Sequence, residues 1–223
     1  MHIRRYWPDA LLLGGFVALT GALAAGWFLG FDVAVRDWCD GHRPAALYWT
    51  ARVLNVLGNG TWLALVALGL AVLLARRTRS WRPLLLPVVA FVATSLVVYA
   101  LKLWTDRGAP RSDRVELFSG GESYPAGHLV VAVVWYGVIV SLLSLPPRVR
   151  LAIRVVPVVV VFVTTVYLSF HWTTDDVGGL LLGLLLDRTV RRSARLSPPS
   201  PPAPGRGSAA DPRGPERIPA PRR

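Results

Sequence analysis

The sequence contains very little cysteine and lysine. Cys39 is the only cysteine among 223 residues, which excludes an internal disulfide and a metal site built from cysteines. Lys102 is the only lysine among 25 lysines and arginines. Polar residues are also scarce, since 53% of the chain is hydrophobic and its mean hydropathy is +0.44. This composition is too apolar for a soluble domain and indicates a membrane protein with several spans.

Six apolar segments are candidate membrane spans. We expect them at residues 10–31, 53–75, 83–104, 127–145, 151–170 and 176–190, of which the last is short. Asparagines and glycines between residues 55 and 60 weaken the start of the second segment, which could begin nearer Thr61. Residues 32–50 carry aromatic anchors and are expected at the membrane interface. The first segment is too long for a cleavable signal peptide, so none is expected.

The positions of the arginines predict how these segments cross the membrane. With six spans, the N-terminus, the loop at 76–82, the turn at 146–150 and the tail after 188 share one side, and all carry arginines. The positive-inside rule places that side in the cytoplasm. This topology explains the formal net charge of +12, so no nucleic-acid partner is expected. The sequence predicts an all-α polytopic membrane protein with six transmembrane helices and both termini in the cytoplasm.

The chain is expected to divide into two parts, a six-helix membrane domain over residues 1–190 and a Pro/Arg-rich tail over residues 191–223. From Ser197 onward the tail holds nine prolines and few apolar residues. It cannot bury a core and is predicted to be disordered. Its arginines could contact anionic lipid head groups, or the tail could simply be solvated.

Three polar segments fall on the predicted extracytoplasmic side. The first contains Lys102, Arg107 and Arg111, three cations within ten residues that could hold an anion. The alternative is that these cations reach for lipid head groups at a helix end.

The second segment leads into the fourth predicted span through a proline and a glycine. The backbone N–H groups of Ala126 and Gly127, together with the helix dipole, would favour a phosphate beside His128. Only four histidines occur in the chain, and both His128 and His171 fall on this side.

The third segment holds His171 and Asp175, four residues apart, a spacing that places two side chains on one face of a helix. Such a carboxylate can hold the imidazole in one tautomer and stabilise its positive charge. The simpler interpretation is a helix start capped by Thr174 or Asp175, with His171 at the membrane interface.

These residues together fit phosphoryl transfer. Lys102 and the nearby arginines would hold a dianionic phosphoryl group while one histidine attacks phosphorus and the other protonates the leaving oxygen. Asp175 would stabilise positive charge on His171. This chemistry needs no metal and no cofactor. A zinc site on the two histidines is the competing idea, but Asp175 and Asp176 alone would supply it poorly.

The three segments resemble the motifs of the type 2 phosphatidic acid phosphatase family of membrane lipid phosphatases. The pattern Lys-x6-Arg-Pro is similar to residues 102–110, Pro-Ser-Gly-His to 125–128, and Ser-Arg-x5-His-x3-Asp to 164–175. The resemblance covers roughly residues 10–190. It implies a six-helix fold in which His171 forms a phosphohistidine, His128 is the general acid, and Asp175 pairs with His171.

Several positions depart from the family pattern. The first-motif arginine, the second-motif serine, and the third-motif serine and arginine are replaced by Ala109, Ala126, Thr164 and Thr165. Arg107 and Arg111 flank the first gap and could fill it, while Ser123 or Tyr124 could supply the missing hydroxyl. Nothing obvious replaces the arginine at Thr165. Each lost charge-assisted contact costs on the order of 1.5–3 kcal/mol of binding.

We therefore expect a metal-independent lipid phosphatase in a prokaryotic plasma membrane, with its active site on the extracytoplasmic face. Candidate substrates are polyprenyl phosphates or diphosphates, phosphatidic acid and phosphatidylglycerol phosphate. Two alternatives stay open, a lipid phosphotransferase on the same fold and a catalytically silent lipid-binding protein. The missing arginines favour these alternatives, whereas the intact set of Lys102, His128, His171 and Asp175 favours the enzyme.

Overall fold

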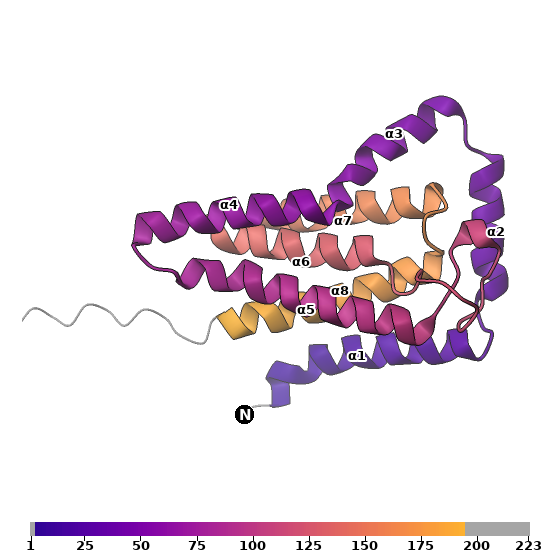
Figure 1. Ribbon diagram of the computed structural model, residues 1–223, viewed down its shortest axis with the longest axis horizontal. Helices are drawn as coiled ribbons and strands as arrows, with labels where there is room; N and C mark the ends of the chain where they lie inside the picture. Colours follow the sequence, from indigo (N-terminus) through magenta and orange to yellow (C-terminus); the bar gives the residue numbers. More distant parts are fainter. Residues whose placement is uncertain (1–2, 195–223) are drawn as a thin grey trace, which may run out of the picture.

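The computed structural model describes residues 3–194, and its secondary structure there is entirely helical (Figure 1). In chain order the α-helices are α1 (Ile3–Ala24), α2 (Leu29–Gly41), α3 (Ala45–Asn55), α4 (Gly60–Thr78), α5 (Arg82–Thr105), α6 (Gly127–Leu142), α7 (Pro147–Tyr167) and α8 (Thr173–Ala194). Two short 3-10 turns, Val56–Gly58 and Pro110–Ser112, lie between them. The predicted all-α fold is confirmed. The tail predicted to be disordered lies outside the described residues, and the division into two domains stays a prediction.

Within residues 3–194, four helices are long and apolar enough to cross a membrane, namely α1, α4, α5 and α7. α6 is strongly apolar but has only 16 residues. α8 carries acidic residues in its first turn and arginines in its last. The predicted number of six spans and the cytoplasmic placement of both termini therefore stay predictions.

The first predicted span ends earlier than expected. α1 stops at Ala24, and the chain then turns through Gly26 and Phe28, whose φ angles are +81° and +66°. Residues in this left-handed region cannot continue a right-handed helix, so α2 begins separately at Leu29. The prediction of one span over residues 10–31 is wrong at its C-terminal end.

The start of α4 agrees with the expectation that the second span begins near Thr61. The Asn59 side chain caps this helix, because its Oδ1 accepts hydrogen bonds from the backbone N–H groups of Thr61 and Trp62. Upstream, the region around Asn55 forms the end of α3 and a 3-10 turn. The four later predicted spans match α5, α6, α7 and α8 to within a few residues.

α6 forms the centre of the bundle, and most of its residues from Leu129 to Val140 are buried. α8 packs closely against it at two glycines. A Cβ added at Gly179 would lie 2.6 Å from the Ala126 carbonyl oxygen, and one added at Gly183 would lie 3.0 Å from Val133 Cβ. The glycine pair therefore serves helix packing, as the Gly-x-x-x-Gly spacing predicts.

The elements that carry the three motifs gather at one end of the bundle. The loop between α5 and α6, the start of α6 and the turn between α7 and α8 lie there, beside α2 and α3 (Figure 1). The outward faces of α5 and α7 instead carry exposed apolar side chains, such as Phe91 and Val159. Such faces suit contact with lipid chains.

Candidate active site

A backbone hydrogen bond joins the second and third motifs. The N–H of Ala126 donates to the carbonyl oxygen of Asp175 at 3.0 Å, which fixes the start of α6 against the start of α8. This bond corrects the expectation that the Ala126 amide binds phosphate, because its hydrogen is already donated. The amide of Gly127, the first residue of α6, has no acceptor within the helix.

His171 and Asp175 lie side by side, as their spacing predicts. Nδ1 of His171 is 3.7 Å from Oδ2 of Asp175. The Ser123 hydroxyl links the two, since its Oγ is 3.3 Å from His171 Nδ1 and donates to Asp175 Oδ2 at 2.5 Å. The backbone N–H of Trp172 donates to the same Oδ2 at 3.0 Å. Asp175 thus faces one nitrogen of the imidazole and leaves the other directed elsewhere.

His128 also lies close to His171. The two imidazole centroids are 5.7 Å apart and their planes cross at 65°. His128 is exposed at the start of α6, whereas the side chain of His171 is only 9% exposed. The structure therefore brings together the two histidines that the sequence singles out.

Arg107 is fully buried, and its guanidinium bonds to protein groups. Its Nη1 donates to Asp175 Oδ1 at 2.6 Å and to Thr174 Oγ1 at 2.8 Å, and its Nη2 donates to Asp32 Oδ2 at 2.8 Å. Its Nε donates to the Val115 carbonyl oxygen at 2.8 Å. These bonds correct the expectation that Arg107 holds phosphate, because its guanidinium has no surface to offer a substrate.

Asp32, from α2, completes this buried network. It accepts the backbone N–H of Thr174 at 3.0 Å as well as the Arg107 guanidinium. Burial raises the pKa of the Asp32 carboxyl. Burial alone would also raise the pKa of Asp175, but its interactions with His171 and Arg107 hold that pKa below its ordinary value. Asp175 is therefore suited to carry the negative charge beside His171.

Lys102 reaches the same end of the bundle from the last turn of α5. Its Nζ donates to the carbonyl oxygen of Glu122. Its Cε lies 3.7 Å from the position of a Cβ added at Gly127. The Lys102 side chain therefore lies close to the start of α6.

Two exposed arginines flank the residue before His171. The guanidinium carbon of Arg111 lies 5.1 Å from the centre of the Phe170 ring, and that of Arg52 lies 5.6 Å from the same centre. The sequence predicts a cation at Arg111, but it does not predict Arg52 of α3 as part of the site. In the sequence, Arg52 is simply an arginine at the edge of an apolar segment. Asp32 was missed too, although it directly follows an apolar run.

Thr164 and Thr165, which replace the serine and arginine of the third motif, both form hydrogen bonds inside the protein. Thr165 is fully buried and donates from Oγ1 to Asp176 Oδ2 at 2.5 Å. Thr164 accepts a hydrogen bond from Asn55 Nδ2 at 3.0 Å. Of the other candidate hydroxyls, that of Tyr124 bonds Thr20 at 2.8 Å, away from the histidines. Ser123 is therefore the hydroxyl that the site uses.

The sequence comparisons give the class of protein to which this helical bundle belongs. Residues 62–196 match the model of the PAP2 superfamily, and the chain belongs to that superfamily. It is 33% identical over 190 residues to phosphatidylglycerophosphatase B of Bacillus subtilis, covering 81% of this chain and 91% of that protein. The chain is thus a membrane phosphatase homologous to that enzyme, and its class acts on lipid phosphate.

The fold agrees with a solved structure of the same class. The crystal structure of a transmembrane PAP2-type phosphatidylglycerolphosphate phosphatase from Bacillus subtilis matches with a TM-score of 0.73 and 26% identity. The match covers 86% of this chain and 97% of that one. The prediction of a multi-pass membrane protein is therefore confirmed.

Proposed function

We propose that the protein hydrolyses a lipid phosphate through a phosphohistidine on His171, without a metal, at the extracytoplasmic face of the membrane. The observation that carries this proposal is the closeness of both Asp175 and His128 to His171. Nδ1 faces the carboxylate at 3.7 Å, and the His128 ring centre is 5.7 Å away. A nucleophile oriented by a carboxylate and accompanied by a second imidazole suits acid–base and covalent catalysis.

The first step transfers the phosphoryl group to His171. With Nδ1 facing Asp175, Nε2 attacks phosphorus, a P–N bond forms, and the bond between phosphorus and the lipid oxygen breaks. His128 donates a proton to that leaving oxygen. Asp175 stabilises the positive charge that remains on the His171 ring.

The second step regenerates the enzyme. His128, now neutral, accepts a proton from a water molecule as its oxygen attacks phosphorus. The P–N bond breaks and inorganic phosphate leaves. Ser123 and Arg107 act as positioning residues throughout, since both bind the Asp175 carboxylate rather than the substrate.

The phosphate would be held by Lys102, Arg111 and the N–H of Gly127, with Arg52 as a further cation. Arg111 and Arg52 both stand over Phe170, next to the nucleophile. They take over the role of the arginines that the motifs lack at Ala109 and Thr165. Positive charge here neutralises the equatorial oxygens in the transition state.

Phosphatidylglycerol phosphate is the substrate that the comparisons favour, since the names of both Bacillus subtilis relatives specify phosphatidylglycerophosphate. Phosphatidic acid and polyprenyl phosphates are the other members of the panel to test. All share a phosphate monoester or diphosphate on an apolar tail, which the histidine pair can reach from the bilayer.

The test is phosphate release by the detergent-purified protein from this panel, with EDTA present, beside the His171→Ala variant. We expect release from at least one lipid that resists EDTA and disappears in the variant. Release that EDTA abolishes would contradict the metal-independent mechanism. If phosphate appears on an added acceptor alcohol instead of in solution, the protein is a phosphotransferase.

A further inference from the structure

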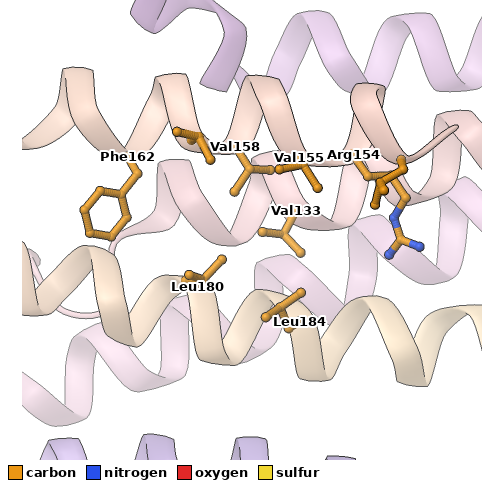
Figure 2. A pocket seen from close by; sticks show the side chains of 9 residues that line it. Val133, Arg154, Val155, Val158, Phe162, Leu180 and Leu184 are labelled. Carbon is orange, nitrogen blue, oxygen red and sulfur yellow. The ribbon is translucent and has the colours of Figure 1, made fainter. Parts of the chain in front are cut away.

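A groove separates α8 from α7, the helix that precedes it in the chain. Its volume is about 440 Å³, and its largely apolar walls include Phe162 of α7 and Leu180 of α8 (Figure 2). Along this groove the two helices are not in close contact. The first turn of α8, which carries Asp175, is instead held by individual polar contacts, and one set of them comes from α2.

Asp32 of α2 binds this first turn. Its Oδ1 accepts the backbone N–H of Thr174 at 3.0 Å, and its Oδ2 accepts the Thr174 hydroxyl at 2.5 Å. The first N–H groups of a helix have no acceptor within the helix, so a carboxylate placed here holds the helix start. Asp175 is the next residue, and Asp32 thus helps to fix its position.

The same carboxylate faces the guanidinium that binds Asp175. Arg107 Nη2 donates to Asp32 Oδ2 at 2.8 Å, while Arg107 Nη1 donates to Asp175 Oδ1 at 2.6 Å. All three side chains are buried. Asp32 accepts hydrogen bonds from one guanidinium, one hydroxyl and one backbone N–H. This is the pattern of an ionised carboxylate, which has acceptors only.

The charges of these three side chains connect Asp32 to His171. Arg107 and Asp175 alone would sum to zero, and a neutral pair stabilises positive charge on a neighbouring imidazole only weakly. With Asp32 there are two carboxylates and one guanidinium, so one negative charge remains. The His171 ring therefore lies beside a network that carries the charge of a full carboxylate.

We propose that Asp32 is a positioning residue of the active site, which fixes the first turn of α8 and supplies the negative charge that Arg107 would otherwise cancel. In its effect on catalysis this inference rests on the proposed function of His171 as the nucleophile. Asp32 is buried, so it acts through Arg107 and α8 rather than on the substrate. It precedes residues 62–196, which match the PAP2 model, so α2 adds to the site from outside that region.

The test measures the titration of His171 in the full chain in detergent, without substrate. Exchange of the imidazole Cε1 hydrogen for deuterium, followed by digestion and mass spectrometry, gives a titration midpoint for each histidine. Asp32→Asn should move the His171 midpoint to lower pH by about one unit, because the protonated ring loses the net negative charge beside it.

Asp37→Asn is the matched control. Asp37 is an exposed carboxylate of the same helix, and it pairs with Arg36, which keeps Asp113 as a second partner. This variant should leave the His171 midpoint unchanged. It removes the same charge from α2 as Asp32→Asn does, so a difference between the two variants reports the buried carboxylate.

The other ionisable side chains around His171 and Asp175 are the same in both variants. They are His128 of α6, Lys102 of α5, Arg52 of α3, Asp176 of α8, and Arg111 and Glu122 of the loop between α5 and α6. Their charges therefore do not account for a shift that only Asp32→Asn shows.

A double variant separates charge from packing. Arg107→Gln leaves two carboxylates and should move the His171 midpoint to higher pH. Asp32→Asn combined with Arg107→Gln leaves one carboxylate and should return the midpoint close to the wild-type value. A purely structural role for Asp32 predicts lower stability without these opposite shifts. The comparison of Arg107→Gln with the double variant also decides the question if Asp32→Asn alone does not fold.

The kinetic consequence is a kcat about tenfold lower in Asp32→Asn, since one unit of titration corresponds to a factor of ten. Asp37→Asn should keep the wild-type kcat. An unchanged His171 midpoint in Asp32→Asn, or equal midpoints in Arg107→Gln and the double variant, would overturn the proposal. The titration needs no turnover. A wild type that releases no lipid phosphate would therefore contradict the proposed function, while the midpoints would still decide the role of Asp32.

Discussion

Arg107 Nη1 donates to Asp175 Oδ1 at 2.6 Å, and both side chains are fully buried. The same guanidinium bonds Asp32 on α2. Arg107, which the sequence predicts to hold the substrate, therefore binds and positions Asp175, the carboxylate beside His171. Its neighbour Arg111 is exposed, so the two arginines should respond differently to the same substitution.

Arg107→Gln should destabilise the protein strongly. Removing one partner of a buried ion pair leaves an uncompensated charge and costs about 3–5 kcal/mol. We expect the melting temperature to fall on the order of 10 °C, together with a loss of activity. Arg111→Gln is the matched control, with an unchanged melting temperature and kcat/KM about tenfold to hundredfold lower. Equal melting temperatures for the two variants would show that the buried network does not support the fold.

Ser123→Ala should slow catalysis without unfolding the protein. The Ser123 hydroxyl joins His171 Nδ1 and Asp175 Oδ2, so its loss frees the imidazole to rotate. One hydrogen bond of this kind is worth about 1.5 kcal/mol, which corresponds to a kcat about tenfold lower. Ser119→Ala, in the same loop but bonded to the Glu116 carbonyl oxygen, should keep the wild-type kcat. A wild-type kcat in Ser123→Ala would show that the Ser123 hydroxyl does not position His171 for catalysis.

Gly179→Ala should damage the packing of α8 on α6. The added methyl group would lie 2.6 Å from the Ala126 carbonyl oxygen, which is backbone at the start of the second motif. Overpacking of this kind costs about 1–3 kcal/mol, and it should lower activity as well as thermal stability. Gly69→Ala, on α4 where nothing lies within 4 Å, should be neutral or slightly stabilising. Similar melting curves for both variants would contradict the packing described for α8.

Arg52→Gln tests whether Arg52 contributes positive charge at the substrate phosphate. Arg52 stands 5.6 Å from the centre of the Phe170 ring, beside the nucleophile. We expect kcat/KM for a lipid phosphate to fall about tenfold, with little change in stability because the side chain is exposed. Arg77→Gln removes an equally exposed arginine at the far end of α4 and should change neither quantity. An Arg52→Gln enzyme with normal kinetics would leave Lys102 and Arg111 as the only cations at the phosphate.

Much of this structure could be predicted because long apolar runs and the positions of charges indicate membrane helices directly. The positions of α5 to α8 and the late start of α4 follow from local patterns, and so does the pairing of His171 with Asp175. The predicted topology and the family resemblance placed His128 on the same side. The break after Ala24 could not be predicted, since it depends on a positive φ at Phe28, a residue type that rarely adopts one.

The role of Arg107 was equally hidden from the sequence. Arg107 and Arg111 are the same residue type in the same loop, and only tertiary contact with Asp32, 75 positions away, separates their functions. Arg52 was missed for a similar reason. It reaches Phe170 because α3 packs beside α7, which no local pattern in the sequence reveals.

Trapping a phosphorylated intermediate on His171 tests the proposed mechanism. The protein would be mixed with phosphatidylglycerol phosphate labelled in its terminal phosphate, quenched in alkali during turnover, digested and examined by mass spectrometry. We expect an alkali-stable, acid-labile phosphate on His171 that is absent from His171→Ala. Turnover by the wild type with no phosphate on His171, or label on another residue, would contradict it.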